Sequence, residues 1–362
     1  MYLTVPFRRA AVIVSLASLA ACVDATSPTE ITRGEIEALT ERSSNAQDRL
    51  EAVFQRIAPD ILALPGTVFA DNDERAGRLV FGVENRSAAN GVLTAMSRLG
   101  LRAADYEVRI TAPIVLAATL RDRFNPTIAG TQIHFGQYVC TLGFNVDHVG
   151  GRSFITNSHC TNRQGGTEGT QYYQPLQSSH PVAIATEAAD PVYQKGIAGC
   201  SKGKSCRRSD ASRALYAAAQ PSARGEIGQT TGFNNNSLTL ASATARFTIT
   251  GQNDATTNFP IGTVVNKVGR TTGWTRGQIT NTCVTTNVSG SRIQQICQSF
   301  VSDPGGATVV SGGDSGSPVF QGTSSSVTLV GILWGGSSDN KLFVFSPLKS
   351  IEDELGQVNA VK

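Results

Sequence analysis

Glycine is unevenly distributed along this chain, and its distribution is the feature that most constrains the fold. Thirty of the 36 glycines follow residue 127. Short alternating runs separated by turn residues occupy the same part of the chain, for example residues 132–144, 263–268 and 327–333. Many short strands with frequent turns are typical of an antiparallel β-sandwich or a pair of β-barrels. We therefore expect residues 128–362 to form an all-β domain.

Residues 23–127 have a mixed α and β pattern instead. Thr32 and Glu35 form a capping-box pattern, which predicts the start of a helix, and Pro59 and Pro65 are expected to end it. The following segments alternate between strand, helix and strand patterns: 78–83, 88–99 and 106–112. We expect a small α/β domain here, joined to the β-rich part by a polar linker at 121–127.

The overall composition narrows the function classes. A length of 362 residues allows two or three domains, and 40% hydrophobic residues are enough for packed cores. The net charge is only +3, which does not favour nucleic acid as a partner. We therefore expect protein or peptide partners and no nucleic acid.

The N-terminus has the pattern of an export signal. Arg8 and Arg9 precede an apolar run at 10–21, which is shorter than the roughly 20 residues of a membrane span. The run ends at Cys22 and resembles the bacterial lipoprotein signal, which implies a lipid on Cys22 that anchors the chain to a membrane. The alternative is an ordinary cleaved signal, 1–22, with an incidental cysteine. Both interpretations place the protein outside the cytoplasm, anchored at the cell envelope or secreted.

Six further cysteines lie in the β-rich part, and six cysteines allow fifteen pairings. Proximity in the sequence favours three disulfides: Cys140–Cys160, Cys200–Cys206 and Cys283–Cys297. The spacings are too wide for a CxxC metal pair, and only one histidine adjoins a cysteine. We expect no metal and no cofactor.

The segment 311–318 (SGGDSGSP) carries the strongest chemical signal. Small residues on both sides of Ser315 allow a tight turn, in which backbone N–H groups and the hydroxyl point at one place. A nucleophile beside an oxyanion hole requires this arrangement. The alternative is a Gly/Ser-rich hairpin loop without chemistry.

A serine nucleophile needs a base, and the base needs a carboxylate that orients it. Of the four histidines, His159 ends an apolar strand next to Cys160, which makes it the best candidate for the base. Asp210 precedes a predicted strand and is the best candidate for the carboxylate. Asp190 competes with it, although the proline that follows Asp190 suggests a turn.

Together these motifs resemble those of chymotrypsin-fold serine proteases, closest to the bacterial α-lytic protease and streptogrisin group. The segments that carry the resemblance are 128–131 (IAGT), 139–144 (VCTLGF), 156–160 (TNSHC), 209–211 (SDA), 269–274 (GRTTGW), 312–318 (GGDSGSP) and 330–335 (VGILWG). The resemblance implies two antiparallel six-stranded β-barrels. It also implies that His159 is the general base, that Asp210 orients it, and that Ser315 attacks the carbonyl. The N–H groups of Gly313 and Ser315 then form the oxyanion hole, and Cys140–Cys160 matches the family's disulfide beside the histidine.

The resemblance also suggests the residues of the substrate cleft. Leu333, Trp334 and Gly335 correspond to the strand that lines the cleft, and Val309 to the base of the specificity pocket. An uncharged residue at 309 favours apolar substrate side chains over Arg or Lys. The sequence departs from the family pattern at Ser158, which is usually alanine, and in the cleft strand, which lacks the serine that usually contacts the triad aspartate.

By the same resemblance, residues 23–127 are a pro-region that assists folding and occupies the cleft in cis. The alternative is a permanent accessory domain. A cut near Ile128 would free an amine that could pair with Asp314, as in the animal enzymes, although the bacterial ones manage without that pair. The sequence thus predicts an extracytoplasmic serine endopeptidase. The competing hypotheses are a protease-fold binding protein without turnover and an envelope-anchored structural lipoprotein.

Overall fold

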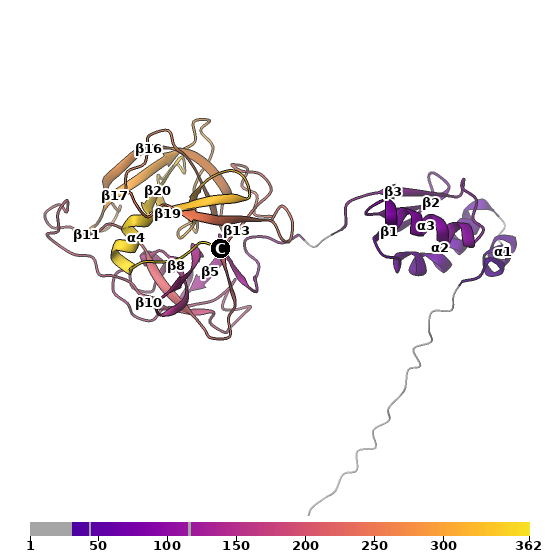
Figure 1. Ribbon diagram of the computed structural model, residues 1–362, viewed down its shortest axis with the longest axis horizontal. Coiled ribbons are helices and arrows are strands. Elements are labelled where there is room, and N and C mark those ends of the chain that lie inside the picture. The colour runs from indigo at the N-terminus through magenta and orange to yellow at the C-terminus, as the bar shows by residue number, and fades with distance from the viewer. Residues whose placement is uncertain (1–30, 43–44, 115–116) are drawn as a thin grey trace, which may run out of the picture. The chain divides into compact units, whose positions relative to one another are not determined.

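The computed structural model describes residues 31–42, 45–114 and 117–362 (Figure 1). The described residues form two compact units, which divide after Ile114. The predicted signal, 1–22, and its Cys22 lie outside the described residues. Within the described residues, no helix combines the length and the apolar character that a membrane span requires.

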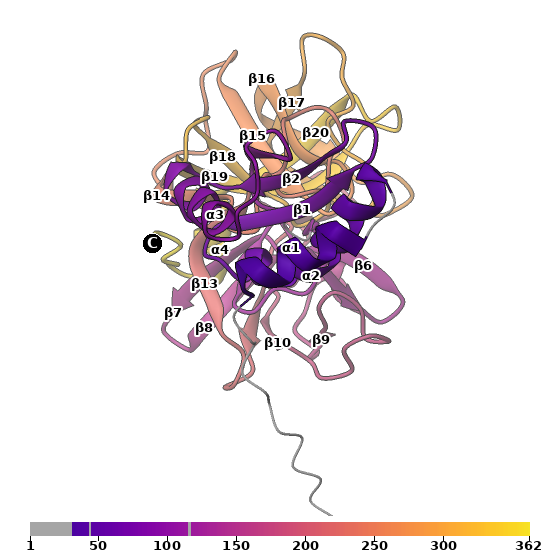
Figure 2. The same cartoon turned by 90° about the vertical axis from the view of Figure 1, so that its right-hand side faces the viewer.

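The first unit is a three-stranded sheet covered by helices, as the α/β pattern predicts (Figure 2). Its helices are α1 (Arg33–Arg42), α2 (Ala46–Leu62) and α3 (Arg86–Arg98), and its strands are β1 (Thr67–Asp73), β2 (Arg78–Val83) and β3 (Tyr106–Ile110). The strand order is β1-β2-β3, with β1 antiparallel and β3 parallel to β2. The predicted strand–helix–strand segment is therefore confirmed as β2–α3–β3, and β1 is an additional strand.

The predicted first helix is divided into α1 and α2. Thr32 and Glu35 form the expected capping box at the start of α1, and Asn45 caps α2 by accepting a hydrogen bond from the Asp48 N–H. Pro59 lies inside α2 and does not end it, and the helix ends at Leu62, before Pro65. Pro59 faces solvent, while the residues around it on the opposite side pack into the core of the unit. The burial of these side chains offsets the hydrogen bond that the proline cannot make.

The second unit is built from short strands, which confirms the all-β prediction for this part of the chain. Its first sheet has five antiparallel strands in the order β7-β8-β12-β10-β9. These strands are β7 (Phe144–His148), β8 (Gly151–Thr156), β9 (Gln171–Tyr172), β10 (Ala185–Ala189) and β12 (Ser212–Tyr216). A hairpin of β5 (Gln132–Phe135) and β6 (Tyr138–Thr141) adjoins β9 through a bridge between His134 and Tyr173.

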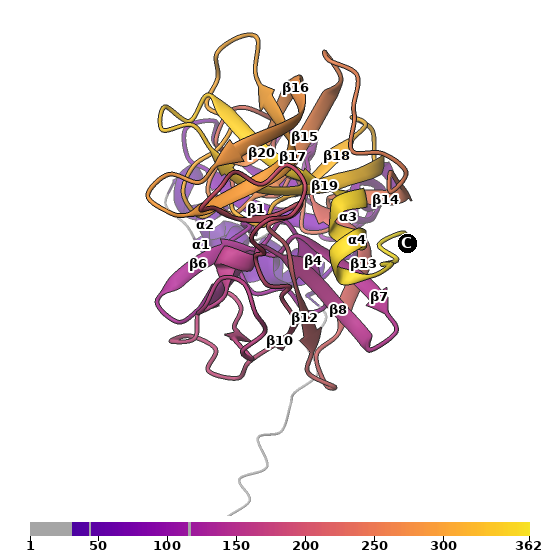
Figure 3. The same cartoon turned by 90° about the vertical axis from the view of Figure 1, so that its left-hand side faces the viewer.

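The other sheet contains six strands that pair antiparallel in a closed cycle, β15-β16-β17-β20-β19-β18 and back to β15 (Figure 3). These strands are β15 (Val264–Gly269), β16 (Gly273–Asn287), β17 (Ile293–Ser302), β18 (Pro318–Gln321), β19 (Ser326–Gly336) and β20 (Leu342–Pro347). The remaining elements are β4 (Thr127–Ala129), β11 (Ser205–Arg207), β13 (Ser222–Gly228), β14 (Arg246–Gln252), the 3₁₀ turn η1 (Ser158–Cys160) and helix α4 (Leu348–Leu355).

Three disulfides connect neighbouring segments of the second unit. They are Cys140–Cys160, Cys200–Cys206 and Cys283–Cys297, with sequence separations of 20, 6 and 14 residues. These are the three pairs that proximity favours, so the pairing prediction is confirmed. Disulfides persist in oxidising compartments, and their presence agrees with export from the cytoplasm.

The boundary between the two compact units lies before the predicted linker at 121–127. Leu120 is fully buried and donates its N–H to the Leu238 carbonyl at 2.9 Å, and Phe124 packs against the same core. The Thr127 hydroxyl is bonded to that of Tyr216 at 2.8 Å. These residues therefore belong to the β unit, and the exposed segment next to the boundary is 112–114.

Candidate active site

Strand pairing brings His159 and Asp210 to the same end of the first sheet. His159 follows the end of β8, Asp210 precedes the start of β12, and these antiparallel neighbours pair at Thr156 and Ser212. Two hydrogen bonds fix the segments to each other, because the Ser158 N–H and the Asn157 side chain both donate to the Asp210 carbonyl, at 3.2 and 2.7 Å. The backbone thus positions both side chains before they interact.

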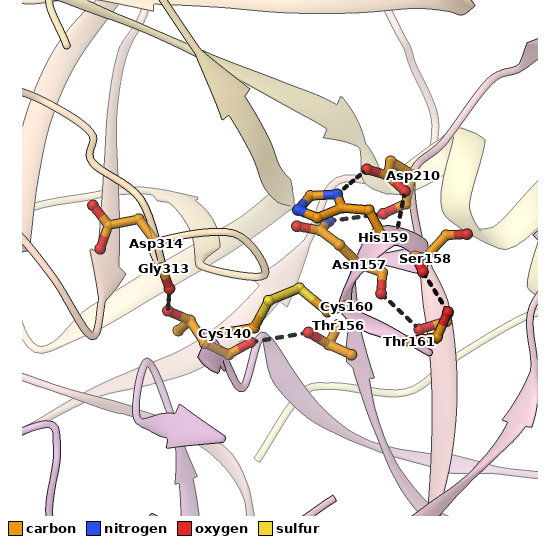
Figure 4. Close-up of a disulfide and its surroundings, with 12 residues drawn as sticks. Cys140, Thr156, Asn157, Ser158, His159, Cys160, Thr161, Asp210, Gly313 and Asp314 are labelled. Atoms are coloured by element: carbon orange, nitrogen blue, oxygen red, sulfur yellow. Dashed lines mark hydrogen bonds and ion pairs between the residues drawn. A yellow bond between two sulfur atoms is a disulfide. The ribbon is translucent and has the colours of Figure 1, made fainter. Parts of the chain in front are cut away.

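The His159 imidazole and the Asp210 carboxylate form a close pair (Figure 4). Nδ1 lies 2.5 Å from Oδ2, and the His159 backbone N–H donates to Oδ1 at 3.2 Å. The carboxylate is buried, whereas 32% of the imidazole is exposed. Because the carboxylate accepts the Nδ1 proton, Nε2 of the neutral ring is left as a proton acceptor on the exposed side.

The charges of this pair stabilise each other. Burial lowers the pKa of His159, but the negative charge and hydrogen bond of Asp210 outweigh it, so the pKa is raised above its ordinary value. Burial raises the pKa of Asp210, but the His159 charge and hydrogen bonds outweigh it, and the net shift is downward. The pair therefore favours the ionised form of Asp210 and makes His159 a stronger base than a free imidazole.

Asp190, the competing carboxylate, does not contact the imidazole. It accepts hydrogen bonds from the Ser158 hydroxyl at 2.8 Å and the Gly165 N–H at 2.9 Å, and it pairs with the buried Arg207 at 2.7 Å. Burial raises the pKa of Asp190, although Arg207 and Ser158 oppose that shift. Ser158, the residue that departs from the family pattern, thus anchors the histidine turn to a second buried carboxylate.

Two further residues contact Asp210 without any sequence motif to mark them. The Tyr193 hydroxyl lies 3.2 Å from Asp210 Oδ1, and the Gln164 side-chain amide lies 3.4 Å from the same oxygen. Both residues belong to the loops between β8 and β11. They are far from Asp210 along the chain and follow no periodic pattern that would mark them in the sequence.

The Ser315 loop packs beside the histidine turn. The Ser315 carbonyl accepts the Thr141 N–H at 2.8 Å, and the Thr141 hydroxyl donates to the Gly313 carbonyl at 3.0 Å. Thr141 follows Cys140, whose disulfide partner Cys160 follows His159. Within the described segments, the structure records no hydrogen bond between the Ser315 hydroxyl and the His159 imidazole. The structure therefore brings the Ser315 loop and the histidine turn together through Thr141 and the Cys140–Cys160 disulfide.

The conformation of the loop requires glycine on either side of Ser315. Gly313 and Gly316 have φ values of +94° and +93°, in the left-handed region. A Cβ atom on Gly316 would lie 2.1 Å from the Thr141 carbonyl oxygen. The glycines thus allow a close approach of the loop to β6, as the motif predicts.

Asp314 is buried beneath this loop and forms an ion pair with Lys267, which is also buried. Lys267 Nζ lies 3.1 Å from Asp314 Oδ2, and both side chains are fully buried. The carboxylate also accepts hydrogen bonds at 2.7–3.1 Å from the Ser311 N–H, the Thr271 N–H, and the N–H and hydroxyl of Thr272. Burial lowers the pKa of Lys267, and Asp314 opposes that shift.

In the uncut chain, the partner of Asp314 is therefore Lys267 from β15 and not an amine at Ile128. Ile128 is 1% exposed and belongs to β4, which pairs with β13. A protease could reach this bond only if the strand left the sheet.

Two neighbouring cavities adjoin these loops. One of about 700 Å³ contains His159, Asp210 and Trp334, and one of about 220 Å³ contains Ser315 and Leu333; both include Gly335. Leu333, Trp334 and Gly335 thus line the cavities beside Ser315 and His159.

Val309, which the resemblance placed at the base of the specificity pocket, does not line the cavity beside Ser315. It is fully buried in an apolar cluster, and its neighbour Val310 lines the smaller cavity. Val310 is buried in the same cluster, and of the two residues it is the one that reaches the cavity surface.

One group of side chains has the spacing of metal ligands. The potential ligand atoms of Cys140, Cys160 and His159 lie within 4.8 Å of one another. The two sulfurs, however, are joined in a disulfide. Neither cysteine therefore offers a thiolate to a metal ion.

Three solved structures show what the chain is similar to. Thermobifida fusca Protease A is 22% identical, with 65% of this chain and 98% of that chain covered and a TM-score of 0.44. A glutamic acid-specific serine protease is 21% identical, with 65% and 100% covered and a TM-score of 0.46. Cellulomonas bogoriensis chymotrypsin is 20% identical, with 65% and 97% covered and a TM-score of 0.42. No protein-family model matches the sequence, and no curated protein matches it.

Proposed function

We propose that the β unit is an extracytoplasmic serine endopeptidase with a Ser315–His159–Asp210 triad. The observation that carries the proposal is the His159–Asp210 pair at 2.5 Å, with the exposed side of the imidazole in a cavity next to the Ser315 loop. A buried carboxylate that holds one imidazole nitrogen and leaves the other free is the arrangement of a general base.

The proposed reaction passes through an acyl-enzyme on Ser315. His159 Nε2 takes the Ser315 proton while the hydroxyl oxygen attacks a peptide carbonyl, and the N–H groups of Gly313 and Ser315 stabilise the oxyanion. His159 then gives the proton to the leaving amine, and an acyl-enzyme remains. Water, deprotonated by His159, releases the acid product and regenerates the Ser315 hydroxyl.

The cavity beside Ser315 supports a preference for uncharged substrate side chains. Its lining residues are Val310, Ser311, Gly312, Ser315, Leu333, Gly335, Gly336, Ser337 and Asn340. None of them is ionisable, so no carboxylate is present to neutralise an Arg or Lys side chain. A peptide-library cleavage profile tests this preference, and preferential cleavage after Arg or Lys would contradict it.

A fluorophosphonate probe tests the triad, because it phosphonylates only an activated serine, whose oxygen displaces fluoride from phosphorus. We expect the wild-type protein to be labelled, Ser315→Ala to lose all labelling, and His159→Ala to lose it by orders of magnitude. His180→Ala is the control, since the His180 imidazole is hydrogen-bonded to Ser179 and is not part of the proposed triad. Labelling that persists in Ser315→Ala would contradict the assignment.

The same probe decides between this function and a protease-fold binding protein. The missing hydrogen bond between Ser315 and His159 favours the second candidate, although such bonds often form only in the substrate complex. A correctly folded wild-type protein that is never labelled would support binding without turnover. An envelope-anchored structural lipoprotein would also remain unlabelled.

For the N-terminal part, we propose a pro-region that acts in cis and a lipid anchor on Cys22. Ala112, Pro113 and Ile114 are exposed, whereas Ile128 is buried, so we expect processing to fall in 112–114. N-terminal sequencing of wild type and Ser315→Ala tests self-processing, and identical uncut chains in both would exclude it. Metabolic labelling with a fatty-acid analogue tests the anchor, with Cys22→Ser as the control.

A further inference from the structure

Oδ1 of the Asp210 carboxylate, the oxygen that does not face the imidazole nitrogen, accepts three hydrogen bonds. Oδ2 faces His159, while Oδ1 accepts from the His159 N–H, the Tyr193 hydroxyl and the Gln164 amide. A buried carboxylate requires such donors because it has lost its water. The cleft strand offers no hydroxyl, since residues 331–336 read GILWGG.

The hydrogen-bonding capacity of Tyr193 fixes the direction of its contact. Its oxygen accepts the side-chain amide of Gln164 at 3.0 Å and that of Gln295 at 2.9 Å. A phenol has one proton and two acceptor positions, and a carboxylate can only accept. With both acceptor positions used, the phenol proton is directed at Asp210 Oδ1, 3.2 Å away.

A buried arginine fixes the ring of Tyr193. The Arg207 guanidinium lies over the ring, 5.1 Å from its centroid. Arg207 is itself 2% exposed and is bonded to Asp190, Glu354 and the Ala211 carbonyl at 2.7–3.2 Å. Because these partners hold the guanidinium, they also restrict the ring below it and the hydroxyl that the ring carries.

We propose that Tyr193 is a positioning residue for Asp210. It orients the carboxylate by donating a hydrogen bond to Oδ1, in place of the serine that the cleft strand lacks. This inference rests on the proposed function, because its consequence is the orientation of the catalytic base. Donation to Oδ1 keeps Oδ2 directed at His159. The positive end of the O–H dipole also lies near the imidazole, so it opposes the charging of that ring.

The test measures the pKa of His159 by NMR titration of the full chain in wild type and Tyr193→Phe. Removing the hydroxyl removes the dipole, so we expect the pKa of His159 to rise. Fluorophosphonate labelling at the optimal pH should slow by about tenfold to a hundredfold, the usual effect of losing a hydrogen bond to a charged group. An unchanged titration together with an unchanged labelling rate would overturn the proposal.

Tyr216→Phe is the matched control. The Tyr216 hydroxyl is also buried and hydrogen-bonded, to Asn145 at 2.6 Å and Thr127 at 2.8 Å, but it does not contact the triad. This variant should leave the pKa of His159 unchanged. A shift equal to that of Tyr193→Phe would assign the effect to general loosening of the unit and overturn the proposal.

A second substitution keeps the test independent of folding. 3-Fluorotyrosine at position 193 retains the hydroxyl and makes it a stronger donor, so the pKa of His159 should shift downward, opposite to Tyr193→Phe. A shift in the same direction as Tyr193→Phe, or none, would overturn the proposal. The titration requires no turnover. A wild type that gives these shifts but is never labelled would therefore contradict the proposed function alone.

Discussion

The buried ion pair between Lys267 and Asp314 makes a quantitative prediction about the Ser315 loop. Lys267→Met retains the length of the side chain and removes its charge, which leaves the fully buried Asp314 carboxylate without its cationic partner. Breaking a buried pair on one side typically costs about 3–5 kcal/mol. The four hydrogen bonds that Asp314 keeps from the loop backbone and Thr272 place the expected loss near the lower limit, at about 3 kcal/mol.

Urea unfolding followed by tryptophan fluorescence measures this loss in the full chain. Both tryptophans, Trp274 and Trp334, lie in the β unit, so the signal reports that unit alone. A loss of about 3 kcal/mol corresponds to a midpoint lower by roughly 1 M or more. Lys267→Met combined with Asp314→Asn removes both charges and should recover part of the stability. A single variant within about 0.5 kcal/mol of wild type would refute the reasoning, because that is the range of an ordinary surface change.

Three further predictions concern the same site. Replacing Cys140 and Cys160 by serine should lower the free energy of unfolding by about 3 kcal/mol, since the disulfide spans 20 residues, and a smaller loss for Cys200–Cys206 is the control. Gly316→Ala should destabilise the β unit by about 3 kcal/mol in urea unfolding, because its Cβ would meet a backbone oxygen at 2.1 Å in a left-handed conformation; wild-type stability would contradict this. Fluorophosphonate labelling should decrease as the pH falls through the raised pKa of His159, with its midpoint above 6.5, and Asp210→Asn should move the midpoint down; a midpoint insensitive to Asp210 would contradict the pair.

The sequence was informative where a property depends on neighbouring residues. Glycines around Ser315 predict a tight turn, and the structure shows left-handed conformations on both sides of it. Cysteines that are close in the sequence are the ones that pair. His159 and Asp210 were selectable because each adjoins the end of a strand, and antiparallel pairing then places those ends together.

Properties that depend on distant contacts could not be predicted. Tyr193 and Arg207 follow no periodic pattern, and the Arg207 partner Glu354 is 147 residues away on α4. Leu120 belongs to the β unit because of a hydrogen bond to Leu238, which no local signal reveals. The cavity is lined by Val310 and not by Val309 for the same reason, because this depends on how the segment packs against distant strands.

The Lys267–Asp314 pair also bears on how this protein can be engineered. Both charges belong to the β unit, so the shape of the nucleophile loop does not depend on the chemical state of a free chain end. Reporter domains or affinity tags inserted upstream of residue 112 would therefore leave this electrostatic support unchanged. A fused form and a trimmed form should share one loop conformation, and any difference in their reactivity would then report obstruction of the cleft.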